Sequence, residues 1–204
     1  HHLDSYNAFF SQGIIDIFKD RNPLRIFKEL DQETKLYKYE CDIYLGGENA
    51  DRIYYGKPII FDQDREHYMY PNEARLRNMT YGFTIHYDVV MKIRILIDKE
   101  DGSIGKNKFT LYEETMEFEK IYLGKFPIML QSNMCLLNGI SSEARFNMGE
   151  CRNDPGGYFI IDGNEKAIVS QEGRGDNLLY ILKDINDIYS YAAEIKSVSE
   201  DAAK

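Results

Sequence analysis

The sequence predicts an α+β fold in which a mostly antiparallel sheet follows helices at the N-terminus. Apolar residues recur at three- and four-residue steps over residues 3–18, which is the spacing of one helix face. Four later segments are rich in Tyr, Ile, Phe and Val, the residue types that favour strands. These segments span residues 36–45, 52–60, 83–97 and 109–118.

The N-terminal helices carry recognisable start signals. Asp4 and Ser5 are candidate caps for the first helix, because short polar side chains accept hydrogen bonds from the first free N–H groups. A second short helix is expected after Asn22, since Pro23 suits the first helical position. Three apolar residues would then share one face of it: Leu24, Phe27 and Leu30.

A long hairpin is expected in the middle of the chain. Its arms, residues 89–98 and 108–119, flank the turn-forming residues Asp101, Gly102 and Gly105. Strands that are joined in this way pair antiparallel, which supports the predicted type of sheet.

Residues 157–171 predict a second hairpin, because Asp162-Gly163 tolerates the positive φ angles that a two-residue turn demands. Four consecutive apolar residues, 158–161, precede the turn and predict a strand covered on both faces, inside the body of the domain. Residues 176–188 have helical or mixed periodicity, and the tail over residues 190–204 has no closing apolar element.

Length and composition describe a globular chain and restrict its partners. The 204 residues are 43% hydrophobic, and the formal net charge is −9. This charge argues against bulk electrostatic binding to nucleic acid or anionic lipid, but it leaves a local basic patch open. No apolar run is long enough for a membrane span. Cys41, Cys135 and Cys151 form no CxxC pair, so we expect reduced thiols in an intracellular protein and no zinc site.

The residues do not form a catalytic signature. His67 and His86 lie outside any motif such as GxSxG, so a structural role is expected for both. The acidic residues from Glu113 to Glu119 are interpreted as a solvated sheet edge, because no His or Asp joins them to complete a metal site. We therefore expect no catalytic residue and no metal ligand in this chain.

Two residues are candidates for contact with nucleic acid. Gln171 and Arg174 follow directly on the predicted buried hairpin. The turn Gly173-Arg174-Gly175 lacks the framework of a P-loop, but a guanidinium at this place can hold a backbone phosphate at two points.

A second pair of candidates lies in the segment YPNEARLRNMTY (residues 70–81), which we expect to be helical. Glu73 and Arg77 have the spacing of a helical ion pair, whereas Arg75 is two residues from Arg77 and cannot share that partner. Two roles stay open for these Arg side chains. They brace the domain, or one of them anchors a strand, a partner subunit or a phosphate.

Several of these segments resemble the second-largest, β-type subunit of multisubunit DNA-directed RNA polymerases. The resemblance rests on four blocks in the family's order and with compatible spacing: HLDSYN (residues 2–7), YPNEARLRNMTY (70–81), GKFPIML (124–130) and DPGGYFIIDGNEKAIVSQE (154–172). Glu150-Cys151 also matches the Glu-Cys of eukaryotic-type members. The resemblance covers residues 2–177.

The resemblance implies a domain assignment. Residues 1–185 would form the first part of the protrusion domain, and residues 186–204 would enter the neighbouring lobe domain. In the family a segment that returns after the lobe completes the protrusion. We therefore expect an incomplete part of a longer subunit, with exposed apolar surface that an isolated copy hides by self-association.

The resemblance also implies a function, which is template-directed RNA synthesis by a nucleotidyltransferase complex. This part of the subunit would lie outside the catalytic centre and line the cleft near the RNA–DNA hybrid, with Gln171 and Arg174 as candidate contacts. Its partners would be the largest subunit and other polymerase subunits, the DNA template, the hybrid and initiation factors. The essential Mg is held in the family mainly by an Asp triad on the other large subunit, so no cofactor is expected here.

The sequence also departs from the family. The loop QEGRGDN (residues 171–177) separates its Arg from Gln-Glu by one residue, whereas cellular eukaryotic members tend to place the Arg directly after Gln-Glu. The resemblance implies a nuclear protein if the source is a cellular eukaryote, and a cytoplasmic or virion protein if the source is a large DNA virus. The frequent use of Tyr, Ile, Asn and Lys suggests an AT-rich genome and so favours the viral source. An alternative function is a stand-alone module that keeps the protrusion fold and binds a protein partner through the acidic edge.

Overall fold

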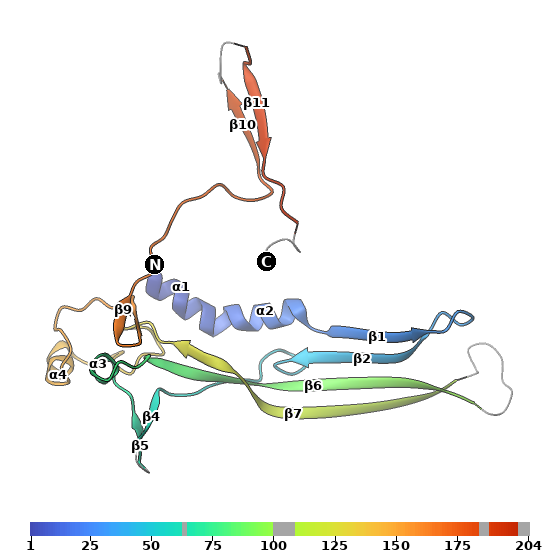
Figure 1. Ribbon diagram of the computed structural model, residues 1–204, viewed down its shortest axis with the longest axis horizontal. Coiled ribbons are helices and arrows are strands. Elements are labelled where there is room, and N and C mark those ends of the chain that lie inside the picture. The colour runs from blue at the N-terminus through green and yellow to red at the C-terminus, as the bar shows by residue number, and fades with distance from the viewer. Residues whose placement is uncertain (63–64, 100–108, 184–187, 200–204) are drawn as a thin grey trace. The chain divides into compact units, whose positions relative to one another are not determined.

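A computed structural model describes residues 1–62, 65–99, 109–183 and 188–199 of the chain. The chain divides into two compact units, His1–Ala167 and Ile168–Lys204 (Figure 1). The first unit is an antiparallel sheet with helices and small hairpins, and the second contains one hairpin. This architecture confirms the predicted α+β class.

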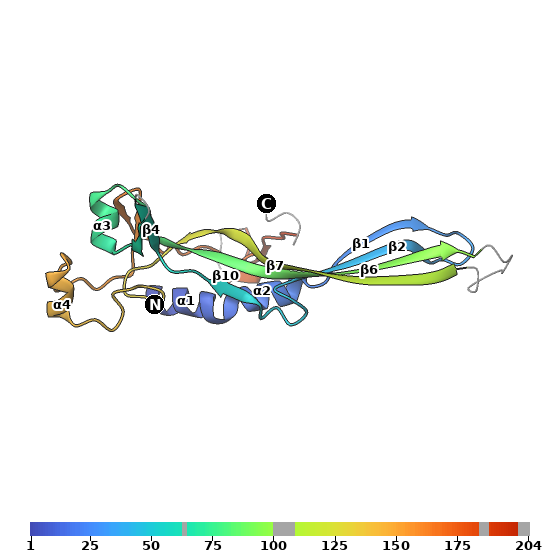
Figure 2. The same ribbon diagram turned by 90° about the horizontal axis from the view of Figure 1, so that it is seen from below.

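The first unit begins with a continuous helical segment, as predicted. The expected caps are wrong, because the helix begins at His2 and both Asp4 and Ser5 lie within it. The segment consists of α1 (His2–Ala8), a π-helical turn, η1 (Phe9–Gly13), and α2 (Ile14–Arg21). Its apolar stripe faces the sheet, and the buried members of the stripe are Phe10, Ile14 and Phe18. The Phe10 ring lies 5.2 Å from that of Phe83 and 6.2 Å from that of Phe126. The helical segment therefore covers the part of the sheet that contains Phe83 and Phe126 (Figure 2). No helix among the described residues is long and apolar enough to cross a bilayer.

The second predicted helix is wrong, because residues after Asn22 form a strand. β1 (Leu24–Leu30) pairs antiparallel with β2 (Tyr37–Leu45). The Asn22 side chain does not cap a helix. It donates to the Leu45 carbonyl at 2.8 Å and accepts from the Leu45 N–H at 2.8 Å, as a strand backbone would. The alternation of Leu24, Ile26 and Leu30 is the two-residue period of a strand.

The central strand of the sheet is β6 (Gly82–Asp98). β2 and β3 (Ile53–Tyr55) pair with successive stretches along one of its edges, and β7 (Phe109–Pro127) pairs along the other. The hairpin predicted from residues 89–98 and 108–119 is thereby confirmed and is longer than expected. Its expected turn residues, Asp101, Gly102 and Gly105, lie outside the described part of the chain.

Residues between β3 and β6 form a small hairpin and a short helix. The predicted strand over residues 52–60 divides into β3 and β4 (Ile59–Asp62), and β4 pairs with β5 (Arg65–Tyr68). The helix predicted over residues 70–81 is confirmed as α3 (Pro71–Leu76), but it ends early. Asn78 has a φ of 51°, a left-handed conformation that stops a helix.

The Asp162-Gly163 turn is confirmed, with φ angles of 49° and 76°. It joins β8 (Phe159–Ile161) to β9 (Asn164–Lys166), so both arms are shorter than predicted. Phe159 and Ile160 are buried, as expected for the first arm. The expectation is wrong for the second arm, because β9 is exposed throughout. Between β7 and β8 lies a further helix, α4 (Ser142–Asn147), which Ser141 caps through its side chain.

The second unit consists of β10 (Leu179–Lys183) paired antiparallel with β11 (Tyr191–Ile195). The helical interpretation of residues 176–188 is wrong for the stretch that forms β10, where Leu179, Ile181 and Lys183 alternate with Tyr180 and Leu182 across the ribbon. The domain boundary expected between residues 185 and 186 lies outside the described residues and stays a prediction.

Burial divides the sheet of the first unit into an inner and an outer part. The inner part contains the core, whose largest fully buried side chains include Tyr81, Phe83, Ile85, Ile128, Leu130, Leu137 and Ile160. The outer part is formed by β1, β2 and the halves of β6 and β7 that pair with them. Most of its side chains are half-buried or exposed, and the buried exceptions are Asp42, Val89, Val90 and Phe109. The three cysteines are free thiols.

The outer part of the sheet has two chemically different faces. Register and strand alternation place mainly aliphatic and aromatic residues on one, which we call the apolar face: Leu24, Ile26, Tyr39, Ile43, Met91, Ile93, Ile95, Tyr112 and Met116. Lys28 and Glu114 are the charged members of this face. The opposite side, the ion-pair face, carries Arg25, Glu40, Asp42, Lys92 and Arg94. Ion pairs cross its strands, among them Arg94–Glu40 at 3.0 Å and Arg25–Asp42 at 3.3 Å.

Candidate functional site

Helix α3 gives Arg75 and Arg77 different surroundings. Pro71 occupies the first turn of the helix, and the buried Ala74 fixes the helix against the core. Because Arg75 and Arg77 are two residues apart, their side chains point in different directions. Arg75 faces the loop and hairpin that follow α4, whereas Arg77 faces β4 and β5.

The Arg75 guanidinium binds three separate parts of the chain. Nη1 donates to Glu150 Oε2 at 2.8 Å, Nε donates to Glu165 Oε1 at 2.9 Å, and Nη2 donates to the Tyr158 hydroxyl at 2.7 Å. The planar fork of Arg supplies these donors in fixed directions, which a Lys ammonium cannot do. We call these residues, with Asp154, the Arg75 network.

Tyr158 extends the Arg75 network by a further hydrogen bond. Its hydroxyl accepts from Arg75 and donates to Asp154 Oδ2 at 2.5 Å, while Asp154 Oδ1 accepts from the Gly156 N–H at 2.9 Å. Burial and this bond to the Asp154 carboxylate raise the pKa of Tyr158 above its ordinary value. The phenol therefore stays protonated and keeps its donor role.

Glu150 is the buried member of the Arg75 network, with a relative exposure of 5%. A carboxylate at such a position needs a cation, because desolvation of an unpaired charge is costly. Burial alone would lower the pKa of Arg75, but the hydrogen bond and charge of Glu150 outweigh it and hold that pKa above its ordinary value. Arg75 is therefore charged in the folded protein.

Backbone and Thr80 contacts attach the β8–β9 hairpin to the residues after α3. The Tyr81 N–H donates to the Ile160 carbonyl at 3.0 Å, and the Gly163 N–H donates to the Met79 carbonyl at 3.1 Å. The Thr80 hydroxyl donates to Asp162 Oδ1 and accepts from the Asp162 N–H, both at 3.1 Å. With the Arg75 network, these contacts join residues 75–81 to residues 150–166.

Arg77 forms a separate and more exposed cluster. Its Nη1 contacts Glu73 Oε1 at 3.0 Å, the ion pair expected from the helical spacing, and Asp62 Oδ2 at 3.3 Å. His67 Nε2 lies 3.1 Å from the same Glu73 oxygen. Both Arg side chains of α3 thus hold carboxylates, and a phosphate contact by either of them stays a prediction.

Gln171 and Arg174 belong to the second unit. Gln171 lies in an exposed segment without regular structure. The Arg174 guanidinium forms an ion pair with Glu194 on β11 and lies 5.4 Å from the centre of the Tyr180 ring. Tyr180 in turn accepts a hydrogen bond from the Gly175 N–H at 3.0 Å, so the loop is folded back onto its own ribbon.

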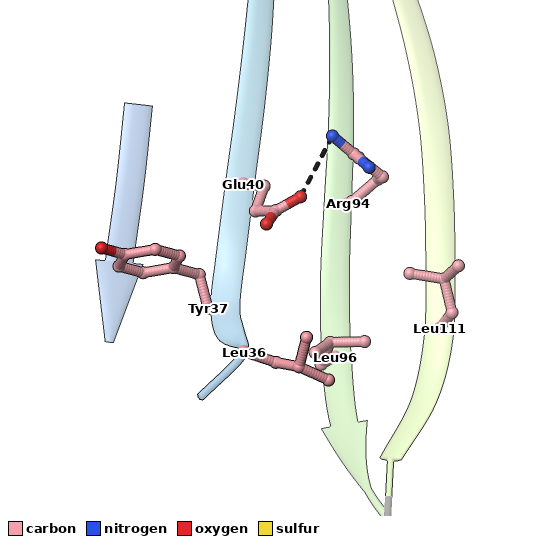
Figure 3. A pocket seen from close by; sticks show the side chains of 6 residues that line it. All are labelled: Leu36, Tyr37, Glu40, Arg94, Leu96 and Leu111. Carbon is pink, nitrogen blue, oxygen red and sulfur yellow. Dashed lines mark ion pairs between the residues drawn. The ribbon is translucent and has the colours of Figure 1, made fainter. Parts of the chain in front are cut away.

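Two further features singled out from the sequence lie on the long strands β6 and β7. The His86 ring lies 5.4 Å from the Tyr122 ring, and the Glu113–Glu119 stretch lies on the exposed strand β7. Figure 3 shows a pocket at the outer end of the sheet, where Leu36, Leu96 and Leu111 lie to one side of the Glu40–Arg94 ion pair. Within the described ranges, three or more His, Cys, Asp or Glu residues do not come together in a way that could hold a metal ion.

Sequence reasoning did not find the partners of Arg75. Glu150, Asp154, Tyr158 and Glu165 were visible only as members of blocks that resemble a family, and spacing gave no sign that they meet one Arg. An acidic residue within a stretch of sequence that is expected to be buried is only a weak signal of a buried ion pair.

The sequence is similar along nearly its whole length to known polymerase subunits. A family model described as RNA polymerase beta subunit matches residues 1–186. The DNA-directed RNA polymerase II subunit RPB2 of Schizosaccharomyces pombe is 34% identical over 205 residues, which cover 99% of this chain and 16% of that protein. DNA-directed RNA polymerase II subunit 2 of Arabidopsis thaliana is 32% identical, with 98% and 16% covered. The subunit Rpo2N of Methanothermobacter thermautotrophicus is 36% identical over 182 residues, with 89% and 29% covered. The chain thus spans less than a third of each of these relatives.

Proposed function

Because this chain belongs to the RNA polymerase beta subunit family, we propose that it works as part of a DNA-directed RNA polymerase. The similarity that carries this proposal extends over 99% of the chain, in relatives whose names give the polymerase activity. The polymerase joins ribonucleotides on a DNA template, and this part of the subunit contributes surface and binding groups outside the catalytic centre. The alternative of a stand-alone binding module is not favoured, since the similarity to polymerase subunits is not confined to one surface or motif.

The proposed partners follow from this assignment. Other polymerase subunits, the largest one included, would bind the chain within the complex, and initiation factors would dock on its outer surface. The DNA template and the RNA–DNA hybrid would pass close to it. The polymerase would act inside the cell, and its Mg would be held mainly by the other large subunit.

Within this function, Gln171 and Arg174 are proposed to contact the nascent RNA or the hybrid. Arg174 is more than half exposed, and its carboxylate partner Glu194 is exposed as well. Exposed ion pairs contribute only about 0–1 kcal/mol, so a phosphate group can replace Glu194 at little cost. The cation–π contact with the Tyr180 ring restricts the rotamers of the Arg174 side chain and so orients its guanidinium.

Reconstituted polymerase that carries Arg174→Ala in the full-length subunit tests this contact. We expect elongation complexes to dissociate at lower salt, with the slope of log affinity against log salt reduced by about 1. Lys196→Ala is the matched control, because Lys196 is an exposed cation of the same unit that is paired with Asp176. Equal salt dependence in the wild type, the Arg174 variant and the control would remove Arg174 from the contact surface.

A further inference from the structure

We propose that Arg75 is a positioning residue that fixes the place where the chain leaves the first unit. This inference rests on the proposed function, because the chain that leaves there carries the proposed RNA contacts Gln171 and Arg174. Arg75 itself would touch no nucleic acid. It would act by holding Glu165, and through it strand β9.

The connection begins with Glu165, which lies on β9 shortly before the first unit ends at Ala167. β9 is three residues long, exposed along its length, and paired with β8 by three residues. A strand of this size is weakly held by its own hairpin. The 2.9 Å bond from Arg75 Nε to Glu165 attaches it to α3.

The other contacts of Arg75 keep its guanidinium from following the hairpin if the hairpin moves. Nη1 is paired with Glu150, which is buried, and Nη2 is bonded to Tyr158, which Asp154 holds in turn. The backbone of α3 is fixed by the buried residues Pro71 and Ala74. The guanidinium is therefore a fixed point, and Glu165 is the exposed end that depends on it.

Replacement of Glu165 separates a positioning role from simple loss of stability. The Glu165 side chain is 55% exposed, so Glu165→Ala removes the bond to β9 without leaving a buried charge unpaired. Arg75→Lys is the second variant, because it keeps a cation for Glu150 but cannot bond all three partners. Arg77→Lys is the matched control on the same helix, since Arg77 binds Glu73 and Asp62, neither of which belongs to β9.

The first measurement is hydrogen exchange of the full-length subunit in reconstituted polymerase. Glu165→Ala and Arg75→Lys should raise exchange at the amides of β9, residues 164–166, by roughly two- to fivefold, the factor expected when a local opening loses one exposed ionic bond of up to about 1 kcal/mol. Arg77→Lys should leave this segment unchanged. Unchanged exchange in Glu165→Ala would overturn the inference, whatever happens to the stability of the complex.

The second measurement is a double-mutant cycle on the half-life of elongation complexes. If Glu165 acts through the position of Arg174, then adding Glu165→Ala to Arg174→Ala should shorten the half-life no further than Arg174→Ala does alone. Independent effects that multiply would contradict the positioning role. If Arg174→Ala has no effect by itself, the proposed RNA contact fails, and the exchange result alone then decides whether Arg75 fixes the hairpin.

Discussion

The inner and outer parts of the sheet differ in what covers them, although β6 and β7 run through both. In the inner part the helical segment covers one face, and Ile85 of β6 is fully buried. Further along the same strand, Ile97 is 54% exposed. Because burial of apolar surface is the main favourable contribution to folding, the inner part must supply most of the stability.

Polar groups are treated differently in the two parts as well. In the Arg75 network the buried Glu150 carboxylate is paired with a guanidinium that is only 20% exposed, whereas on the ion-pair face of the outer part the buried Asp42 carboxylate is shared by Arg25 and Arg94, which are 59% and 42% exposed. A buried pair is costly to break, and an exposed pair contributes little. The inner part therefore holds the chain in one folded arrangement, whereas the outer part keeps side chains accessible to other molecules.

The largest effect is expected from Arg75→Met. It leaves the Glu150 carboxylate buried without a partner, which should lower the free energy of unfolding by about 3–5 kcal/mol. Urea unfolding of the purified chain followed by circular dichroism measures this change. Arg77→Met, on the same helix, should cost less than about 1 kcal/mol because its pairs are exposed. Equal losses in the two variants would contradict the assigned roles.

A pair of Ile replacements compares the two parts of β6 directly. Ile85→Ala should lower the free energy of unfolding by about 2–5 kcal/mol, because it leaves a cavity in the core. Ile97→Ala removes the same atoms from an exposed position and should change it by about 0.5 kcal/mol or less. Urea unfolding again gives both values, and similar losses would show that the outer part is packed as tightly as the inner part.

We expect the apolar face to make the isolated chain self-associate and bind hydrophobic dyes. Met116→Lys on this face should reduce binding of a hydrophobic dye and concentration-dependent self-association, because it adds a charge to a mainly apolar surface. Thr115→Lys adds the same charge to the neighbouring position on the opposite face and is the control. Dye fluorescence and gel filtration measure the effect, and an equal decrease in both variants would point to net charge as the cause.

The smallest effect concerns the pH dependence of the exposed cluster around Glu73. Burial would raise the pKa of Glu73, but hydrogen bonds from His67 and Arg77 outweigh it and lower the pKa below its ordinary value of 4.5. A lowered folded-state pKa stabilises the protein above the unfolded-state pKa, and this contribution is lost as pH falls through the folded-state value. Stability of the wild type should therefore fall more than that of Glu73→Gln between pH 5 and pH 3, as about 4.5 is crossed. Urea unfolding at the two pH values measures both losses, and an equal loss of unfolding free energy in the wild type and in Glu73→Gln would contradict this.

Local sequence was sufficient where local chemistry decides the structure. The Asp162-Gly163 turn, the Pro71 helix start and the Glu73–Arg77 pair depend on residues within four positions of one another, and all three were predicted. The strand after Asn22 was not predicted, because the Asn22 side chain bonds to the backbone of Leu45, which is 23 positions away. A distant strand edge decided the structure there against a local helix signal.

The Arg75 network marks the same limit at the candidate site. Its partners lie 75, 83 and 90 positions from Arg75, so only the folded chain brings them together. Spacing did show that Arg75 and Arg77 have different partners, but it could not identify the partners of Arg75. The burial of Glu150, which gives the network its energetic weight, depends on the packing of several elements at once.

Isolation of the native protein from its source, followed by native mass spectrometry, tests the central claim most directly. The proposal predicts that this sequence is recovered in a complex with a second large polymerase subunit, and that the complex makes RNA on a DNA template. Recovery of an independent 23.8 kDa protein without polymerase subunits would contradict it.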